Sequence, residues 1–104
     1  IVKRGSAGCV CIHRDGVITL PAYPTTKIVD PTGCGDVFAG AFLAQLVPLR
    51  GRIADIESIR RALVHATVTA SFSIESFGTD AIANLKRGKY RARLDKFRRM
   101  VGII

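Results

Sequence analysis

The chain contains no tryptophan and a single methionine, and none of its apolar runs approaches the roughly 20 residues that a bilayer-spanning helix needs. We therefore expect no membrane span, and no secretory signal is visible. The chain begins with Ile1 and Val2 instead of methionine, so we expect it to start inside a larger protein.

Cysteine is also sparse, with Cys9, Cys11 and Cys34 the three examples. Three cysteines do not suggest a disulfide framework, and no cysteine or histidine cluster has the spacing of zinc ligands. Cys9 and Cys11 are two positions apart, so on a strand they would share one face as small apolar side chains. A reducing, cytoplasmic setting is the expectation.

Acidic residues are few, 8 against 16 basic ones, and half of the basic residues lie between Lys86 and Arg99 beside one acid, Asp95. Two interpretations of this cluster remain open. It is either the solvated surface of a C-terminal helix or a surface that attracts an anion such as a polyphosphate or a nucleic acid.

What is present indicates one small globular domain, because 48% of the 104 residues are apolar and 23% are charged. Residues 10–13 and 17–20 are short β-type runs around Asp15 and Gly16, a dipeptide typical of hairpin turns. Residues 27–29 form another extended stretch. Proline at position 31 disfavours helix at Asp30.

Helices are expected in the second part of the chain. Residues 36–46 are apolar nearly all round, which predicts a helix inside the protein, ended by Pro48. A second helix over 53–74 carries apolar residues at steps of three and four. A short helix follows Thr79 or Asp80, and a basic one covers about 90–100. The stripe of the second helix consists of Ile56, Ile59, Leu63, Ala66 and Ala70.

Strands followed by helices predict one half of a layered α/β architecture. About four short strands and a buried helix cannot close a core by themselves. We therefore expect missing partners, either an absent N-terminal region or other chains.

A glycine-rich turn precedes the first helix. Gly33 and Gly35 flank Cys34, and glycine permits backbone angles that turn several N–H groups toward one point. With the helix N-terminus, these groups predict a site for an anion, such as a phosphoryl group in transfer. Asp36, in the first turn, could accept the proton of an attacking hydroxyl. The alternative is that Asp36 only stabilises the helix start.

The whole segment resembles the C-terminal signature of the ribokinase-like (PfkB-family) carbohydrate kinases. It stands here as Asp30-Pro31-Thr32-Gly33-Cys34-Gly35-Asp36. Pro31 takes a place where threonine is frequent, and Cys34 replaces the usual alanine. The resemblance implies a three-layer α/β/α fold, Asp36 as the catalytic base, and the backbone from Gly33 through Cys34 and Gly35 to Asp36 as the anion hole.

A glycine-x-x-glycine turn lies upstream, in the order that the family shows. The resemblance places Lys3, Gly5, Ser6 and Gly8 near the nucleotide phosphates and ribose, together with Gly35. The Walker-type phosphate loop is absent from the sequence.

The resemblance also implies a nucleotide role for the helix over 59–72, which is similar to the one that covers the adenine in the family. His65 falls where a small polar residue often faces the nucleotide; a structural histidine is the alternative. Asp30 and Thr32 would hold a monovalent cation such as K⁺ with the turn 75–78, which is longer here than in ribokinase.

Residues 1–104 are therefore expected to be the C-terminal nucleotide-binding portion of a PfkB-type kinase domain, without its N-terminal substrate and lid region. The reaction implied is Mg²⁺-dependent transfer of phosphate from ATP to a hydroxyl of a small sugar or nucleoside-like substrate. The isolated chain is expected to be inactive. Alternatives are a nucleotide-binding remnant without catalysis and, less favoured, a nucleic-acid-binding module built on residues 86–99, where Tyr90 and Phe97 are the aromatic company.

Overall fold

The computed structural model describes residues 1–25, 28–29, 32–52, 54–75 and 80–102. Three strands form an antiparallel sheet in the order β1 (Val2–Lys3), β2 (Cys9–His13) and β3 (Gly16–Leu20). The predicted hairpin is confirmed: Cys9 pairs with Leu20 and Cys11 with Ile18.

The hairpin buries one face. Cys9, Cys11, Ile18 and Leu20 are each at most 6% exposed, because alternate residues of a strand point the same way. The cysteines are free thiols that pack as small apolar residues, as their spacing predicted.

Five helical segments follow the sheet. They are α1 (Cys34–Leu46), the 3-10 helix η2 (Val47–Leu49), α2 (Ile56–Ser73), α3 (Asp80–Ala83) and α4 (Arg87–Met100). Each expected helix is present, with shifted ends.

The helix ends have local causes. α2 begins at Ile56 and not at 53, because the Asp55 carboxylate caps it by accepting from the Ser58 N–H at 2.8 Å. Pro48 lies inside η2, one turn after α1 ends. Of the predicted extended stretch, Ile28 and Val29 belong to no strand, and residue 27 lies outside the described residues.

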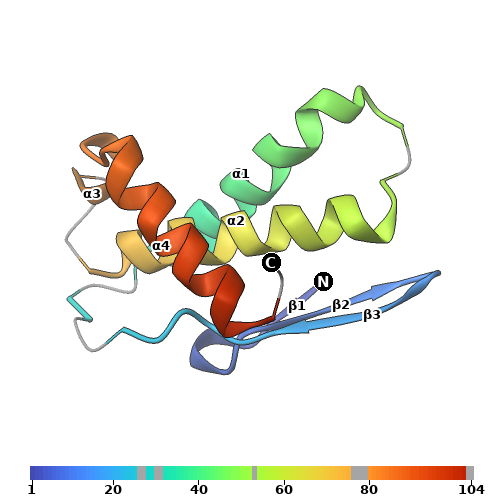
Figure 1. Cartoon of the computed structure of the whole chain (residues 1–104), viewed down its shortest axis with the longest axis horizontal. Helices are drawn as coiled ribbons and strands as arrows, with labels where there is room; N and C mark the ends of the chain where they lie inside the picture. Colours follow the sequence, from blue (N-terminus) through green and yellow to red (C-terminus); the bar gives the residue numbers. More distant parts are fainter. Residues whose placement is uncertain (26–27, 30–31, 53, 76–79, 103–104) are drawn as a thin grey trace.

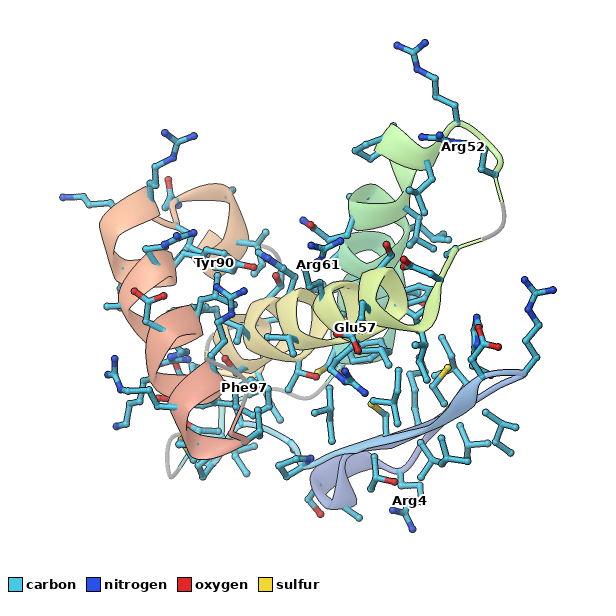
Figure 2. All side chains as sticks on the ribbon, turned by 45° about the vertical axis from the view of Figure 1, so that its right-hand side comes forward. Arg4, Arg52, Glu57, Arg61, Tyr90 and Phe97 are labelled. Carbon is cyan, nitrogen blue, oxygen red and sulfur yellow. The ribbon has the colours of Figure 1, made fainter. Side chains whose placement is uncertain are left out.

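Helix α2 is the centre of the packing. Figure 1 shows it lying between the sheet and α1, with α4 crossing its C-terminal half. Leu63, Val68 and Phe72 of α2 meet the buried face of the hairpin and Phe97 of α4, which is fully buried on the inner side of that helix (Figure 2). Of the stripe predicted for this helix, Leu63, Ala66 and Ala70 are buried and Ile56 and Ile59 are partly buried, but the core also includes Val64, Val68 and Phe72, which the stripe left out.

Helix α1 is buried less than its composition predicts. Phe38 and Phe42 pack against the core, but no residue of α1 is fully buried, and Leu43 is 61% exposed. Val47, directly after the helix, is 71% exposed. Within the described residues α2 covers one side of α1, so the expectation of a helix enclosed on all sides is not met in this chain. No helix among these residues is long and apolar enough to cross a membrane.

The turn between β1 and β2 depends on a glycine. The 3-10 helix η1 (Gly5–Ala7) ends at Gly8, whose φ of 91° favours glycine. A Cβ on Gly8 would lie 2.0 Å from the Leu20 carbonyl oxygen, which belongs to the backbone of β3 and cannot move away cheaply.

We predict that Gly8→Ala destabilises the chain by about 1–3 kcal/mol from backbone strain alone, with the clash added to it. Gly40→Ala is the matched control, since Gly40 lies within α1 and a Cβ there meets nothing within 4 Å. That control should be neutral or stabilising by up to about 1 kcal/mol. Denaturant unfolding of both variants measures the difference, and equal stabilities would contradict the role of Gly8.

Candidate active site

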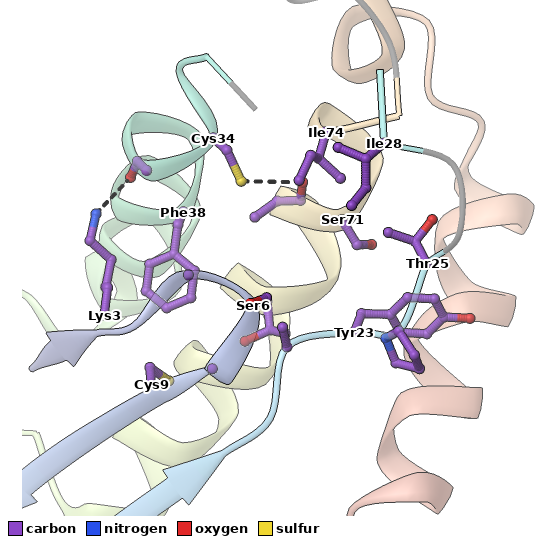
Figure 3. A pocket seen from close by; sticks show the side chains of 17 residues that line it. Lys3, Ser6, Cys9, Tyr23, Thr25, Ile28, Cys34, Phe38, Ser71 and Ile74 are labelled. Carbon is purple, nitrogen blue, oxygen red and sulfur yellow. Dashed lines mark hydrogen bonds between the residues drawn. The ribbon is translucent and has the colours of Figure 1, made fainter. Parts of the chain in front are cut away.

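A cavity of about 610 Å³ opens between the sheet and the helices. Its walls come from β1, the η1 turn, the segment after β3, the first turn of α1 and the C-terminal half of α2 (Figure 3). Most of the predicted ligand-binding residues line it, namely Lys3, Gly5, Ser6, Gly8, Cys34 and Gly35. The fold therefore brings the two glycine-rich segments, some 25 residues apart in the sequence, to one cavity.

The N-terminus of α1 forms one wall. Gly33 is the N-cap with φ of 78° in the left-handed region, and it has no side chain that could cap the helix. The first N–H groups of a helix have no partner within the helix, and the helix dipole makes this end positive. The start of α1 therefore presents N–H groups without a side-chain cap at the place where the sequence predicted an anion site.

Gly35 has a different function from Gly33. It lies within α1, and its missing side chain leaves room for Lys3, because a Cβ there would be 3.0 Å from Lys3 Nζ. Lys3 donates to the Gly35 carbonyl at 3.2 Å, and its ammonium lies 5.8 Å from the centre of the Phe38 ring. Only Gly33 of this pair has the left-handed backbone that both were expected to need. Lys3 places a positive charge beside the helix terminus.

Asp36 lies in the first turn of α1, as predicted, but not in the wall of the cavity. It is exposed and follows directly after the cavity residue Gly35. Its carboxylate is thus accessible to a second molecule next to the helix terminus.

Cys34 links α1 to α2 through a hydrogen bond. Its thiol donates to the Ala70 carbonyl at 3.7 Å (Figure 3), and burial, partly offset by Lys3, raises the pKa of the thiol. The group is thus an uncharged thiol at neutral pH. It replaces the usual alanine of the signature with a residue of similar size.

His65 is not brought to the cavity. It lies on the side of α2 that faces α4, where its Nδ1 is 2.7 Å from the Tyr90 hydroxyl and the two rings stack with centres 6.0 Å apart. Burial, with the charges of Arg98 and Arg91, lowers the pKa of His65. This environment supports the structural alternative for His65.

The α2 residues that do line the cavity are Thr67, Ala70 and Ser71, followed by the C-cap residue Ile74. Thr67 is two positions from His65, about 200° around a helix of 3.6 residues per turn, and so almost on the opposite face. Thr67 and Ser71 were not predicted to be site residues, although two small polar residues four positions apart in an apolar stripe are a signal that could have identified them. Tyr23 and Thr25 were not predicted either, and no local pattern marks them.

The expected monovalent-cation residues are only partly described. Asp30 and residues 76–78 lie outside the described residues, and Thr32 is an exposed residue of the turn before α1. The Val29 N–H donates to the Ile74 carbonyl at 2.9 Å, so the segment before Asp30 lies beside the end of α2. Within the described part of the chain, no group of three histidine, cysteine, aspartate or glutamate side chains could hold a metal ion.

Comparison with known proteins agrees with this geometry. The sequence pattern of the pfkB family carbohydrate kinases matches residues 1–86. The chain belongs to this family, and its fold is that of the ribokinase-like kinases.

Three relatives illustrate the similarity. A nucleoside kinase of Methanocaldococcus jannaschii is 38% identical over 78 residues, which cover 75% of this chain and 24% of the relative. Ribokinase from Giardia lamblia has a TM-score of 0.72 at 27% identity, covering 89% of this chain and 31% of that one. An aminoimidazole riboside kinase of Salmonella enterica, complexed with aminoimidazole riboside and an ATP analog, has a TM-score of 0.69 at 27% identity, covering 86% and 29%. The chain spans about a quarter to a third of their length.

The lowered pKa of His65 gives a prediction about stability. The folded chain favours the neutral ring, so the neutral His65 ring contributes to the free energy of unfolding at pH values above its unfolded pKa of about 6.5. This stabilisation is lost as the pH falls through the lower pKa of the folded chain. An NMR titration of the His65 ring, assigned with His65→Gln, should show a midpoint below about 6.5. A midpoint at or above that value would contradict the half-buried, neutral pair with Tyr90.

Proposed function

We propose that this chain is the ATP-binding part of a kinase that transfers the γ-phosphoryl group of ATP to a hydroxyl of a small sugar or nucleoside-like substrate. The observation that carries the proposal is an open cavity in which Lys3 and the uncapped start of α1 adjoin an apolar end. Membership of the carbohydrate kinase family and the ATP analog in the Salmonella enterica relative support it.

The chemistry of the cavity fits a nucleotide. Tyr23, Ile28 and Ile74 offer apolar surface at one end, suited to the flat face of a base. At the other end Lys3 and the α1 terminus offer positive charge, suited to phosphates. The cavity volume of about 610 Å³ lies within the range of about 300–1,000 Å³ that is typical of small-molecule sites.

The proposed roles follow from position. The N–H groups from Gly33 to Asp36 would stabilise the charge that develops on the transferred phosphoryl group. Asp36, exposed beside them, would accept the proton of the attacking hydroxyl. Gly5, Ser6 and Gly8, on the opposite wall, would lie along the phosphates and ribose.

The cation chemistry fits this arrangement. Mg²⁺ is usually held by one or two carboxylates together with waters and substrate phosphates, so a cluster of acids on the protein is not required. When bound, it neutralises charge on the phosphates. Asp36 is the carboxylate next to the cavity, and Asp30 with Thr32 would hold the monovalent ion.

We predict that Asp36→Asn in the full-length kinase lowers turnover by about 10² to 10⁴ and leaves ATP binding nearly intact, because asparagine keeps the shape but cannot take the proton. Steady-state kinetics and ATP titration measure the two effects. Asp15→Asn, an exposed acid in the hairpin turn, is the control and should behave as wild type. Turnover of Asp36→Asn within a factor of two of wild type would remove Asp36 as the base.

The isolated chain should bind nucleotide without turnover and should associate with itself or with a completing chain. The outer side of α1, with Leu43, exposes apolar surface, and so does Ile12 on the outer face of the hairpin, which is 76% exposed. Covering such surface is favourable by roughly 25 cal/mol per Å².

Sedimentation of the purified chain should therefore show species heavier than the monomer. Leu43→Lys should shift the distribution toward monomer. Met100→Lys, at an exposed apolar residue of α4, should change it less. A monodisperse monomer with a cooperative melt would contradict this proposal.

A further inference from the structure

Arg93 differs from the other basic residues of α4. Most of them are exposed to solvent, whereas the Arg93 side chain keeps 17% of its exposure. Its guanidinium lies 3.8 Å from the centre of the Phe72 ring and 4.8 Å from that of Tyr23. It also donates to the Ser71 hydroxyl and to Glu75 Oε1, both at 3.0 Å. One side chain of α4 thus joins the end of α2 to the segment after β3.

Glu75 extends this connection. Its second carboxylate oxygen accepts from the Thr25 hydroxyl at 2.7 Å, so the two oxygens hold Arg93 and Thr25 separately. Burial alone would raise the pKa of Glu75, but the hydrogen bonds from Thr25 and Arg93 and the nearby positive charges outweigh it and lower the pKa. The carboxylate is therefore ionised at neutral pH, and both contacts are charge-assisted.

The residues held in this way form a wall of the cavity. Tyr23, Thr25 and Ser71 line it, and Figure 3 shows all three on the side nearest α4. Residues 21–25 belong to no helix or strand, so backbone ladders do not fix Tyr23 and Thr25. Side-chain contacts with Arg93 and Glu75 help to fix them, together with the packing of Tyr23 on Phe97, whose ring centres lie 6.0 Å apart.

We propose that Arg93 is a positioning residue for the base-binding end of the cavity. Arg93 holds Tyr23 directly, and Thr25 through Glu75, against the end of α2. It thereby sets the width of the part of the cavity that would accept the flat face of an adenine. Arginine suits this task because its planar guanidinium can stack on an aromatic ring while it donates hydrogen bonds at its edge, whereas the ammonium of lysine has no planar face to stack. The inference rests on the proposed function, and Arg93 lies beyond the residues 1–86 that match the family.

The test compares Arg93→Met, Arg93→Lys and Arg91→Met in the full-length kinase. Arg91 is the matched control, on the same helix but 66% exposed and paired with Asp95. Arg93→Met should raise the KM for ATP about tenfold or more, since it removes charge-assisted hydrogen bonds that hold a binding wall, with kcat nearly unchanged. Arg93→Lys should recover part of the loss, and Arg91→Met should match wild type.

The selectivity between nucleotides distinguishes a positioning role of Arg93 from a role in stability alone. Arg93→Met should loosen this part of the cavity and so reduce the preference of the kinase for ATP over GTP. The preference is measured on variant protein that a melting curve has shown to be folded. An unchanged KM and an unchanged ATP to GTP ratio would overturn the inference. If Arg93→Met does not fold, Glu75→Gln takes its place: it keeps the shape, loses the charge, and should raise the KM in the same direction. An unchanged KM in Glu75→Gln would then overturn the inference.

ATP binding by the wild-type kinase distinguishes a failure of the proposed function from a failure of the inference about Arg93. Absence of ATP binding by the wild-type kinase would overturn the proposed function and this inference with it. ATP binding by wild type together with wild-type behaviour of Arg93→Met would overturn the inference alone.

Discussion

The burial of α2 is the interaction on which the rest of the structure depends. Leu63, Val68 and Phe72 contact the hairpin on one side and α4 on another, while α1 packs along the same helix. Because α2 touches every layer, its orientation determines where the start of α1 meets the strand that carries Lys3. The cavity is the space left where these elements diverge.

Two kinds of constraint shape that cavity. At the end with Lys3 and the start of α1, the backbone decides: Gly33 turns the chain into α1, Gly35 leaves room for Lys3, and Gly8 lets the η1 turn pass the Leu20 carbonyl. At the end with Tyr23 and Thr25, side chains decide, because these two residues belong to no regular element. Mutations at the first end should act through the backbone, whereas those at the second act through packing and ion pairs.

The basic surface of the chain is divided in the same way. Most basic residues of α4 are exposed, which is compatible with both interpretations of the cluster at 86–99. Among the described basic residues, Lys3 lines the cavity and Arg93 contacts its wall. The net positive charge of the chain is therefore a poor guide to the cavity, since most of the described basic residues of α4 lie away from it.

The sequence by itself determined the hairpin, the glycine turn at Gly33 and the helix that starts at the signature, because turn residues, apolar periodicity and glycine geometry act over a few neighbours. It could not determine which face of α2 meets the cavity. His65 and Thr67 are two residues apart, and the packing of α4 on α2 pairs His65 with Tyr90, whereas Thr67 faces the cavity. The link from Arg93 through Glu75 to Thr25 spans almost 70 residues and has no local signal. Only the tertiary structure could decide it, since such contacts exist only once distant segments pack.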